Sequence, residues 1–344
     1  MATVATNNLD YLATRLHARR SRMAEGERLD ELCHLRTIPE LGQALGLDLE
    51  FQSAAQLQRR LVQDLFHELA SCARHVGEVG GELFGWILVR FQVENMKTLI
   101  RGFLNRRSPE VLQEHLLPLP ESLALDVQGL ATAGSMADFI ELLPLGILRE
   151  RLNEVAAAHH DQPQPFYLEA AIDSAYFQML LVKTRHLSGE DLTVVRPLML
   201  QEANFFQFML AVRGRFHYDL PPDVLLSLQV PGLSKDWFKT LLSAPDVMAA
   251  AKCGLGIILD ELPRERGDGE MDVDGLCWKR FHRLANRAFC SGDMGLGVAV
   301  GYAGLRRVET ANLITLSEGI RTGMTAEAIR GRLIPRADAE VAYV

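Results

Sequence analysis

Apolar side chains recur every three or four residues along most of the chain, which is the period of an α-helix. In residues 54–76, for example, leucines stand four positions apart and would share one helix face. Alternation of apolar and polar residues is rare and β-branched residues are thinly spread, so strands are not expected. The pattern predicts an all-α protein with helices within residues 9–45, 54–76, 84–105, 126–154, 166–185, 192–216, 234–242, 249–259, 277–289 and 297–319, and surface loops at 156–165 and 263–269.

The last of these helices carries an acid inside its apolar stripe. At about 100° per residue, Glu309 shares a face with Leu313, Leu316 and Ile320, and Asn312 lies at the edge of that face. An acid among aliphatic side chains is costly unless it is paired. The sequence therefore predicts a polar partner for Glu309 elsewhere in the fold.

A related arrangement of polar positions occurs three times. Its members are spaced by three and then six residues: Gln92, Asn95 and Arg101; Asn204, Gln207 and Arg213; Glu309, Asn312 and Glu318. Each set is followed by an acid eight residues before a proline: Glu110 and Pro118, Asp223 and Pro231, Glu327 and Pro335. One such pattern could arise by chance in a helical protein, but three at near-even separation favour an internal triplication. We therefore predict three similar helical units, at residues 1–120, 121–232 and 233–344.

These repeated positions are interpreted as structural anchors. The anchor residues Gln92, Asn95, Asn204, Gln207, Glu309 and Asn312 are expected to form hydrogen bonds within their units. Arg101 and Arg213 lie opposite the apolar stripe and are expected at a surface or an interface. A generic helical-repeat scaffold is an alternative, but it would repeat roughly every 30 to 45 residues, whereas this chain repeats at the scale of a domain.

Composition and charge exclude several classes of protein. The chain of 344 residues is 48% hydrophobic and 23% charged, as in ordinary globular proteins. Its net charge of −8 argues against a nucleic-acid partner, since phosphate binding requires clustered positive charge. The five cysteines include no CxxC pair, which is typical of free thiols in a reducing cytosol. The N-terminus lacks the pattern of a signal peptide, and no apolar run approaches the roughly 20 residues that span a bilayer.

Catalytic and cofactor motifs are absent or incomplete. There is no GxxxxGK[ST] motif, and the Gly-rich stretches at 253–256 and 292–297 follow no predicted strand. His67-Glu68 begins an HExxH motif, but Ser71 stands where the second histidine would be. The best hydrolase-like cluster is His159-His160-Asp161, which could hold a divalent ion on a helical scaffold. A metal-dependent hydrolase using these residues is therefore kept as an alternative, although a surface loop is favoured and no cofactor or small-molecule substrate is expected.

The order of several motifs resembles a known family. The third copy, Glu309-x-x-Asn312-Leu313-x-x-Leu316-Ser317-Glu318-x-Ile320 with Leu333-Ile334-Pro335, is similar to the C-terminal signature of the C/d subunit of V-type and archaeal-type (V/A-type) rotary ATPases. Gly301-Tyr302 and Asp173-x-x-Tyr176-Phe177-x-x-Leu180 resemble other parts of this family, as do Arg15-Leu16-His17-Ala18-Arg19 and Leu29-x-x-Leu32 near the N-terminus. The likeness extends over essentially the whole chain.

The resemblance implies a non-catalytic adaptor. Members of this family are all-helical and consist of three similar domains, arranged as a funnel around a pseudo-threefold axis. They lie peripherally on the cytoplasmic face of the membrane, where they receive the central stalk and bind the proteolipid ring. The implied partners are therefore the central-stalk subunits and the ring, and the implied function is mechanical coupling in ion transport or ATP synthesis.

Overall fold

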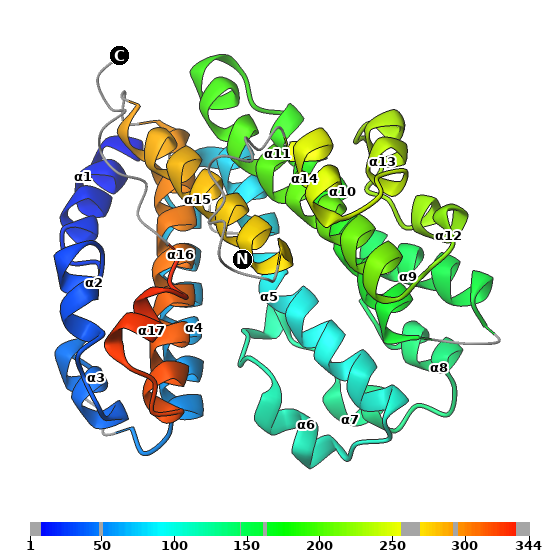
Figure 1. Cartoon of the computed structure of the whole chain (residues 1–344), viewed down its shortest axis with the longest axis horizontal. Coiled ribbons are helices and arrows are strands. Elements are labelled where there is room, and N and C mark those ends of the chain that lie inside the picture. The colour runs from blue at the N-terminus through cyan, green and yellow to red at the C-terminus, as the bar shows by residue number, and fades with distance from the viewer. Residues whose placement is uncertain are drawn as a thin grey trace. The chain divides into compact units, whose positions relative to one another are not determined.

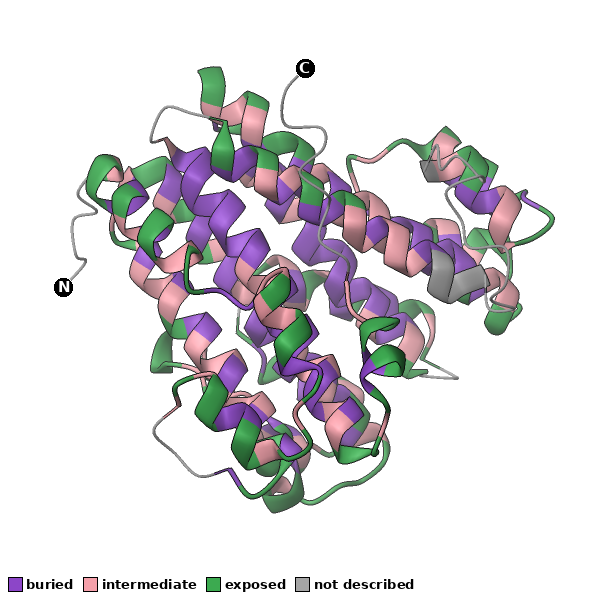
Figure 2. Ribbon diagram, turned by 60° about the vertical axis from the view of Figure 1, so that its left-hand side comes forward, coloured by how far each residue is buried: buried purple, intermediate pink, exposed green. Residues whose placement is uncertain are grey.

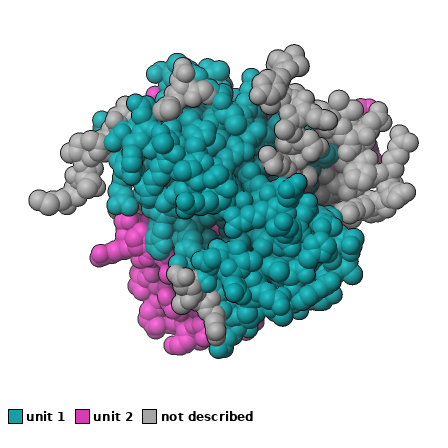
Figure 3. All heavy atoms as spheres, turned by 90° about the vertical axis from the view of Figure 1, so that its left-hand side faces the viewer, with its two compact units in different colours: residues 1–84, 187–198, 274–344 teal, residues 85–186, 199–273 magenta. Residues whose placement is uncertain are grey.

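The computed structural model describes residues 8–47, 51–144, 146–160, 164–255, 269–291 and 295–334. Within these ranges the protein is helical and contains no strand (Figure 1), as the sequence pattern predicts. Its backbone packing separates the chain into two compact units (Figure 3). Unit 1 comprises residues 1–84, 187–198 and 274–344, and unit 2 comprises residues 85–186 and 199–273. The three consecutive segments 1–120, 121–232 and 233–344 stay a prediction about internal similarity.

The helices are assigned to the units as follows. Unit 1 contains α1 (Leu9–Arg20), α2 (Glu27–Leu32), α3 (Ile38–Ala44), α4 (Ala54–Ala73), α16 (Leu296–Arg321) and α17 (Ala326–Arg330). Unit 2 contains α6 (Pro109–His115), the 3-10 helix η1 (Glu121–Leu123), α7 (Val127–Ala131), α8 (Met136–Glu141), α9 (Ile147–Ala158), α10 (Pro165–Arg185), the π-helix η2 (Arg213–His217), α12 (Pro222–Ser227), α13 (Lys235–Leu242) and α14 (Val247–Leu255). The helices α5 (Gly77–Leu104), α11 (Gly189–Val212) and α15 (Gly269–Cys290) each contribute residues to both units.

Unit 1 is built around α16, which packs on α4 and α1. The leucines spaced by four along α4 are buried, as predicted, and Leu57 and Leu61 join Leu313, Leu316 and Ile329 in one apolar cluster. Most residues of α16 are buried (Figure 2). This burial is expected for a helix with neighbours on several sides.

A glycine allows the close approach of α15 and α16. A Cβ atom at Gly301 would lie 2.5 Å from the backbone nitrogen of Phe289 and 2.6 Å from the carbonyl oxygen of Ala285. Because both atoms belong to the α15 backbone, no side-chain rotation could make room. Only glycine fits at this crossing.

In unit 2, α10 is the most enclosed element and packs against α9. Its buried residues face all sides of the helix, from Leu168 and Ile172 to Tyr176 and Leu180. The indole nitrogen of Trp86 on α5 donates a hydrogen bond of 2.9 Å to the carbonyl oxygen of Tyr176. Aromatic packing and this bond together orient α5 against α10.

Two of the predicted helical regions each contain several helices. Residues 9–45 form α1, α2 and α3, because Gly26 adopts a φ of 56° and Thr37 begins α3 with a capping box to Glu40. Residues 126–154 form α7, α8 and α9, which begin after Asp126, Ser135 and Gly146. The predicted loop at 156–165 begins later, since α9 continues to Ala158. Most of the predicted loop at 263–269 lies outside the described residues.

No helix in the described ranges is both long and apolar enough to span a membrane.

Gly301→Ala is expected to lower the free energy of unfolding by about 3 kcal/mol, because the added methyl group must force α15 and α16 apart. Gly85→Ala is the matched control, since no atom lies within 4 Å of a Cβ built there. That substitution should leave stability unchanged or raise it by up to about 1 kcal/mol. Urea titration followed by circular dichroism measures both. Equal stability of the two variants would contradict the proposed close packing.

Candidate functional site

An amide side chain near the end of α5 binds the backbone of one residue in the chain segment that follows. The backbone N–H of Leu117 donates to Oδ1 of Asn95 at 2.8 Å, and Nδ2 of Asn95 donates to the carbonyl oxygen of Leu117 at 2.8 Å. Asn95 is only 6% exposed. The two bonds fix the returning segment against the helix and satisfy both backbone groups of Leu117.

Two further amides have the same kind of partner. Asn312 on α16 accepts from the N–H of Ile334 at 2.7 Å and donates to its carbonyl oxygen at 3.2 Å. Gln207 on α11 accepts from the N–H of Val230 at 2.7 Å. In all three cases the bound residue precedes a proline in the sequence: Leu117-Pro118, Val230-Pro231 and Ile334-Pro335. We call these three pairs the amide clasps.

A glycine follows each clasp amide after seven residues. A Cβ at Gly102 would lie 2.3 Å from Leu112, one at Gly214 would lie 2.2 Å from Leu225, and one at Gly319 would lie 2.5 Å from Ile329. Each glycine therefore admits an aliphatic side chain of the next short helix, α6, α12 or α17. The constant spacing of seven residues between amide and glycine is visible in the sequence, but the predicted repeat did not include the glycines.

The chain also turns in the same way beyond each glycine. The carbonyl oxygen of the glycine accepts from an N–H five or six residues later: Arg107 at 2.9 Å, Leu220 at 2.8 Å and Met324 at 2.9 Å. The residue before each donor has a positive φ: Arg106, Asp219 and Gly323. These bonds pair carbonyls at the end of the long helix, as in common helix-terminating motifs.

The two partners of the middle clasp are one residue farther apart in the sequence than those of the other two. The clasp partners are 22 residues apart at Asn95 and Asn312, but 23 apart at Gln207. Here the end of the long helix is the π-helix Arg213–His217. A π-turn contains one residue more than an α-turn, so it accommodates the longer spacing.

The remaining predicted anchors have diverse environments. Nε2 of Gln92 donates to the carbonyl oxygen of Leu123 at 3.1 Å, and Gln92 is buried. Asn204 lies half-buried on α11 and takes no part in the Gln207 clasp. Glu309 is 5% exposed and accepts from the backbone N–H of Ala24 and from the guanidinium of Arg306. The predicted polar partner of Glu309 is thus confirmed.

Glu309 belongs to a larger polar network centred on Glu68 of α4. The carboxylate of Glu68 accepts from Arg19 at 2.7 Å, from the hydroxyl of Tyr302 at 2.8 Å and from Nε of Arg306 at 2.7 Å. Burial, and then the Glu68 carboxylate, raise the pKa of Tyr302 far above its usual value, so it remains a hydrogen-bond donor. The network joins α1, α4 and α16. In the sequence, Glu68 stands out only as part of an incomplete HExxH motif.

The small cavity beside Glu309 offers no space for a substrate. It measures about 20 Å³ and is lined by Glu309, Asn312 and His282 among others. That volume holds about one water molecule. In unit 2, a cavity of about 380 Å³ is lined mainly by apolar residues such as Trp86, Met96 and Met179. No carboxylate, thiol or hydroxyl group is among its described lining residues.

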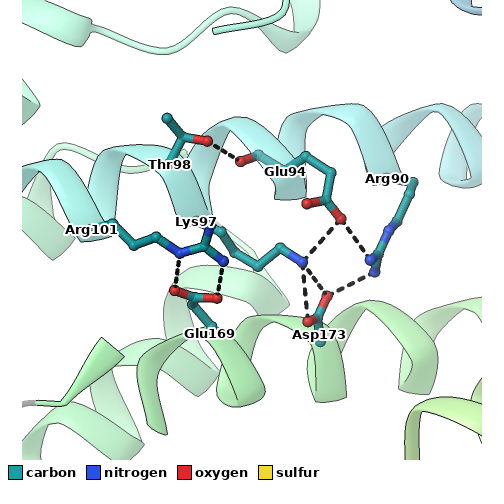
Figure 4. Close-up of polar contacts among 7 residues, drawn as sticks. All are labelled: Arg90, Glu94, Lys97, Thr98, Arg101, Glu169 and Asp173. Atoms are coloured by element: carbon teal, nitrogen blue, oxygen red, sulfur yellow. Dashed lines mark hydrogen bonds and ion pairs between the residues drawn. The ribbon is translucent and has the colours of Figure 1, made fainter. Parts of the chain in front are cut away.

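A second polar network joins α5 to α10 (Figure 4). Arg90, Glu94, Lys97 and Arg101 follow one another at helical spacing on α5, and Glu169 and Asp173 stand one turn apart on α10. Asp173 accepts from Arg90 at 2.7 Å and from Lys97 at 3.3 Å. Glu94 lies 2.6 Å from Arg90 and 3.0 Å from Lys97. We call this group the α5–α10 charge network.

Exposure varies along the charge network, from 9% at Lys97 to 57% at Arg101. The side chains of Lys97 and Asp173 are 9% and 12% exposed, so each needs the other's charge. Burial opposes the charged form of Arg90, but Asp173 and Glu94 outweigh it and raise its pKa. Burial also tends to raise the pKa of Glu94, yet Arg90 and Lys97 lower it overall.

Arg101 and Arg213 both lie at the surface. The guanidinium of Arg101 makes two bonds of 2.5 Å to Glu169, and its side chain is 57% exposed. Arg213 is the exposed first residue of the π-helix. Their role at an interface stays a prediction.

The hydrolase alternative finds no support. The ring of His159 stacks on Tyr167 with centroids 4.4 Å apart, and Nδ1 of His160 lies 3.3 Å from the carbonyl oxygen of Ala157. Asp161 lies outside the described residues. Among the residues that the structure describes, no three His, Cys, Asp or Glu side chains are grouped as metal ligands. The polar groups described above hold helices together and present no nucleophile with a base.

Asn95→Ala should lower the free energy of unfolding by about 2 kcal/mol, because the N–H and C=O groups of Leu117 lose their partners in a half-buried position. The exposed helical residue Asn153 provides the control, since Asn153→Ala removes an amide at the surface of α9. Urea denaturation should separate the variants clearly. If both were equally stable, the clasp would not stabilise the fold.

Asp173→Ala should cost about 3 kcal/mol of stability, since the buried Lys97 and its neighbour Arg90 then share only the more exposed Glu94 as counter-charge. Glu169→Ala should cost less than about 1 kcal/mol, because its partner Arg101 remains exposed to water. Thermal and urea unfolding of the two variants test this difference. A larger effect of Glu169→Ala would contradict the order of burial.

Comparison with known proteins gives the family. The family model described as ATP synthase (C/AC39) subunit matches residues 12–332. The C subunit of the V-type ATP synthase of Deinococcus radiodurans is 22% identical over 340 residues, covering 94% of this chain and 90% of that protein. The C subunit of the A-type ATP synthase of Methanosphaera stadtmanae is 22% identical over 250 residues, covering 69% of this chain and 64% of that protein.

The family match extends over most of both structural units and includes the clasp amides Asn95, Gln207 and Asn312; it ends two residues before Ile334. It therefore does not depend on one local motif. The chain belongs to the ATP synthase (C/AC39) subunit family, whose members are subunits of V/A-type rotary ATPases.

Proposed function

We propose that the protein is a non-catalytic central-stalk subunit that couples the rotating stalk of a V/A-type ATPase to the membrane proteolipid ring. The observation that carries this proposal is the family match over residues 12–332. Two relatives named as C subunits of V-type and A-type ATP synthases support it. The protein would lie peripherally on the cytoplasmic face of the membrane, as part of the complex.

The polar contacts suit a part that transmits torque. When torque acts on two packed helices, they tend to slide along each other. Apolar packing alone resists this sliding only through the fit of the side chains. The charge network instead places oppositely charged groups at matched positions on α5 and α10, such as Asp173 between Arg90 and Lys97. Sliding by one turn would separate buried charges from their partners at considerable cost. The amide clasps also oppose sliding, because each one ties the segment that follows a long helix to the side of that helix.

We also infer that the chain arose by triplication. The amide clasp, the glycine seven residues later and the turn with positive φ recur in the same order at α5, α11 and α16. This recurrence supports three related segments, at about 1–120, 121–232 and 233–344. An arrangement of these segments as a funnel around a pseudo-threefold axis is part of the same proposal.

Purification of the tagged protein from its native membranes tests the function. Nucleotide-binding ATPase subunits and a small proteolipid should be recovered with it, as identified by mass spectrometry. A tagged unrelated cytosolic protein of similar size is the control. Recovery of the chain alone, from membranes that contain an assembled ATPase, would contradict the proposal.

Arg101→Ala combined with Arg213→Ala should weaken assembly with the other ATPase subunits while leaving the helical circular dichroism signal unchanged, because both side chains are exposed. Arg60→Ala is a suitable control, since Arg60 is 43% exposed and pairs within α4 with Asp64 at 2.9 Å. The recovered amount of partner subunits per tagged chain measures the effect. Loss of helical signal in the double variant would instead assign the two arginines to the fold.

A further inference from the structure

The chain passes from one compact unit to the other at four points. These points lie between residues 84 and 85, 186 and 187, 198 and 199, and 273 and 274. Three of them fall inside helices, namely α5, α11 and α15, and the fourth falls in the link between α10 and α11. A passage through a continuous helix would normally be stiff, because every backbone bond continues across it.

Each of the three helices contains a helix-weakening residue within two positions of its passage point. These residues are Gly85 in α5, Pro197 in α11 and Gly275 in α15. Glycine favours a helix less than alanine does, and a proline inside a helix removes one backbone bond and crowds the preceding turn. Pro197 leaves the carbonyl of Thr193 without its usual helical donor.

Packing does not explain these three residues. No atom lies within 4 Å of a Cβ built at Gly85 or at Gly275, and Pro197 is exposed. Several other glycines in the long helices differ, since Gly301, Gly102 and Gly319 all have a neighbour within 2.6 Å of such a Cβ. The glycines at the passage points therefore have no steric need to be glycine.

The fourth passage point is also a weak point of the backbone. α10 ends at Arg185 and α11 begins at Gly189, which has a φ of 57°. A short link with a left-handed glycine can change direction at little cost. All four connections between the units thus share one property, namely a residue at or near the passage point that weakens or redirects helical backbone.

We propose that Gly85, Pro197, Gly275 and the link at 186–189 form a hinge that lets the two compact units change their relative orientation. Such hinges are made of a few positions that absorb changes in φ and ψ while the joined bodies keep their internal structure. The inference concerns the mechanics of the chain and does not depend on the proposed function. In a rotary complex it would add an elastic element to the protein.

The test stiffens the hinge and measures the distance between the units. The variant Gly85→Ala with Pro197→Ala and Gly275→Ala favours straight helices, by about fivefold for each glycine replaced. Spin labels are attached to Thr14→Cys in unit 1 and Asn153→Cys in unit 2, both exposed helical positions. The exposed Cys253 and Cys290 are first replaced by serine, while the other cysteines are buried. Pulsed electron paramagnetic resonance then gives the distance distribution.

We expect a broad distribution in the full chain without the stiffening substitutions, and a narrower one in the triple variant. A label pair inside unit 2, Asn153→Cys with Thr240→Cys, should be narrow in both backgrounds. The hypothesis is overturned if the triple variant is as broad as the parent chain. It is equally overturned if the parent distribution between the units is no broader than that of the pair inside unit 2.

A second variant tests the opposite direction, in case the stiffened chain fails to fold. Arg196→Gly lies beside Pro197 in α11 and should broaden the distance distribution between the units. Ala55→Gly introduces the same residue at an exposed position in α4, away from the passage points, and should leave the distribution unchanged. Equal effects of the two glycines would count against the hinge.

Discussion

The fold depends on the pairing of polar groups where long helices meet other backbone. A helix of more than 20 residues satisfies its own interior, but the segment that returns after it must find partners for its N–H and C=O groups. Asn95 and Asn312 supply both partners from the helix face, and Gln207 supplies an acceptor for the N–H of Val230. Glu68 and Asp173 do the same for buried cations, each receiving more than one donor. Without these groups, the same apolar surfaces could pack in several registers.

Sequence periodicity was sufficient to predict helices and their buried faces, because both follow from local spacing. The leucines of α4 and the stripe of α16 are examples. It also predicted that Glu309 would have a partner, since a buried acid is costly alone. It could not identify Ala24 as that partner, because 285 residues separate the two and only packing brings them together. The region 9–45 was predicted to be mostly helix, but periodicity did not place the helix starts at Gly26 and Thr37 that divide it.

The candidate site was partly accessible from sequence. The repeated amides and the prolines stood out as a pattern, yet the residue that the amide binds is the one before the proline, and its backbone carries no sequence signal. The glycines Gly102, Gly214 and Gly319 did carry a signal at constant spacing and could have been found. The charge network on α5 was hidden because its partners lie far along the chain, Glu169 being 68 residues from Arg101 and Asp173 being 76 residues from Lys97. The sequence also could not predict that each compact unit is made of separate chain segments. That division depends on which distant helices pack together.

The π-helix has a consequence for comparing the segments with one another. Its additional residue places everything after Gly214 one position out of phase with the first segment. A gap at Arg215 restores the correspondence, so that Phe216 aligns with Phe103 and Leu225 with Leu112. Without the gap, the charged Arg215 stands opposite Phe103, the last apolar residue of the stripe in the first segment. With the gap, the aromatic Phe216 takes that place. Under the proposed triplication, an insertion absorbed as a local bulge would conceal the relationship of the segments from any search that assumes constant spacing.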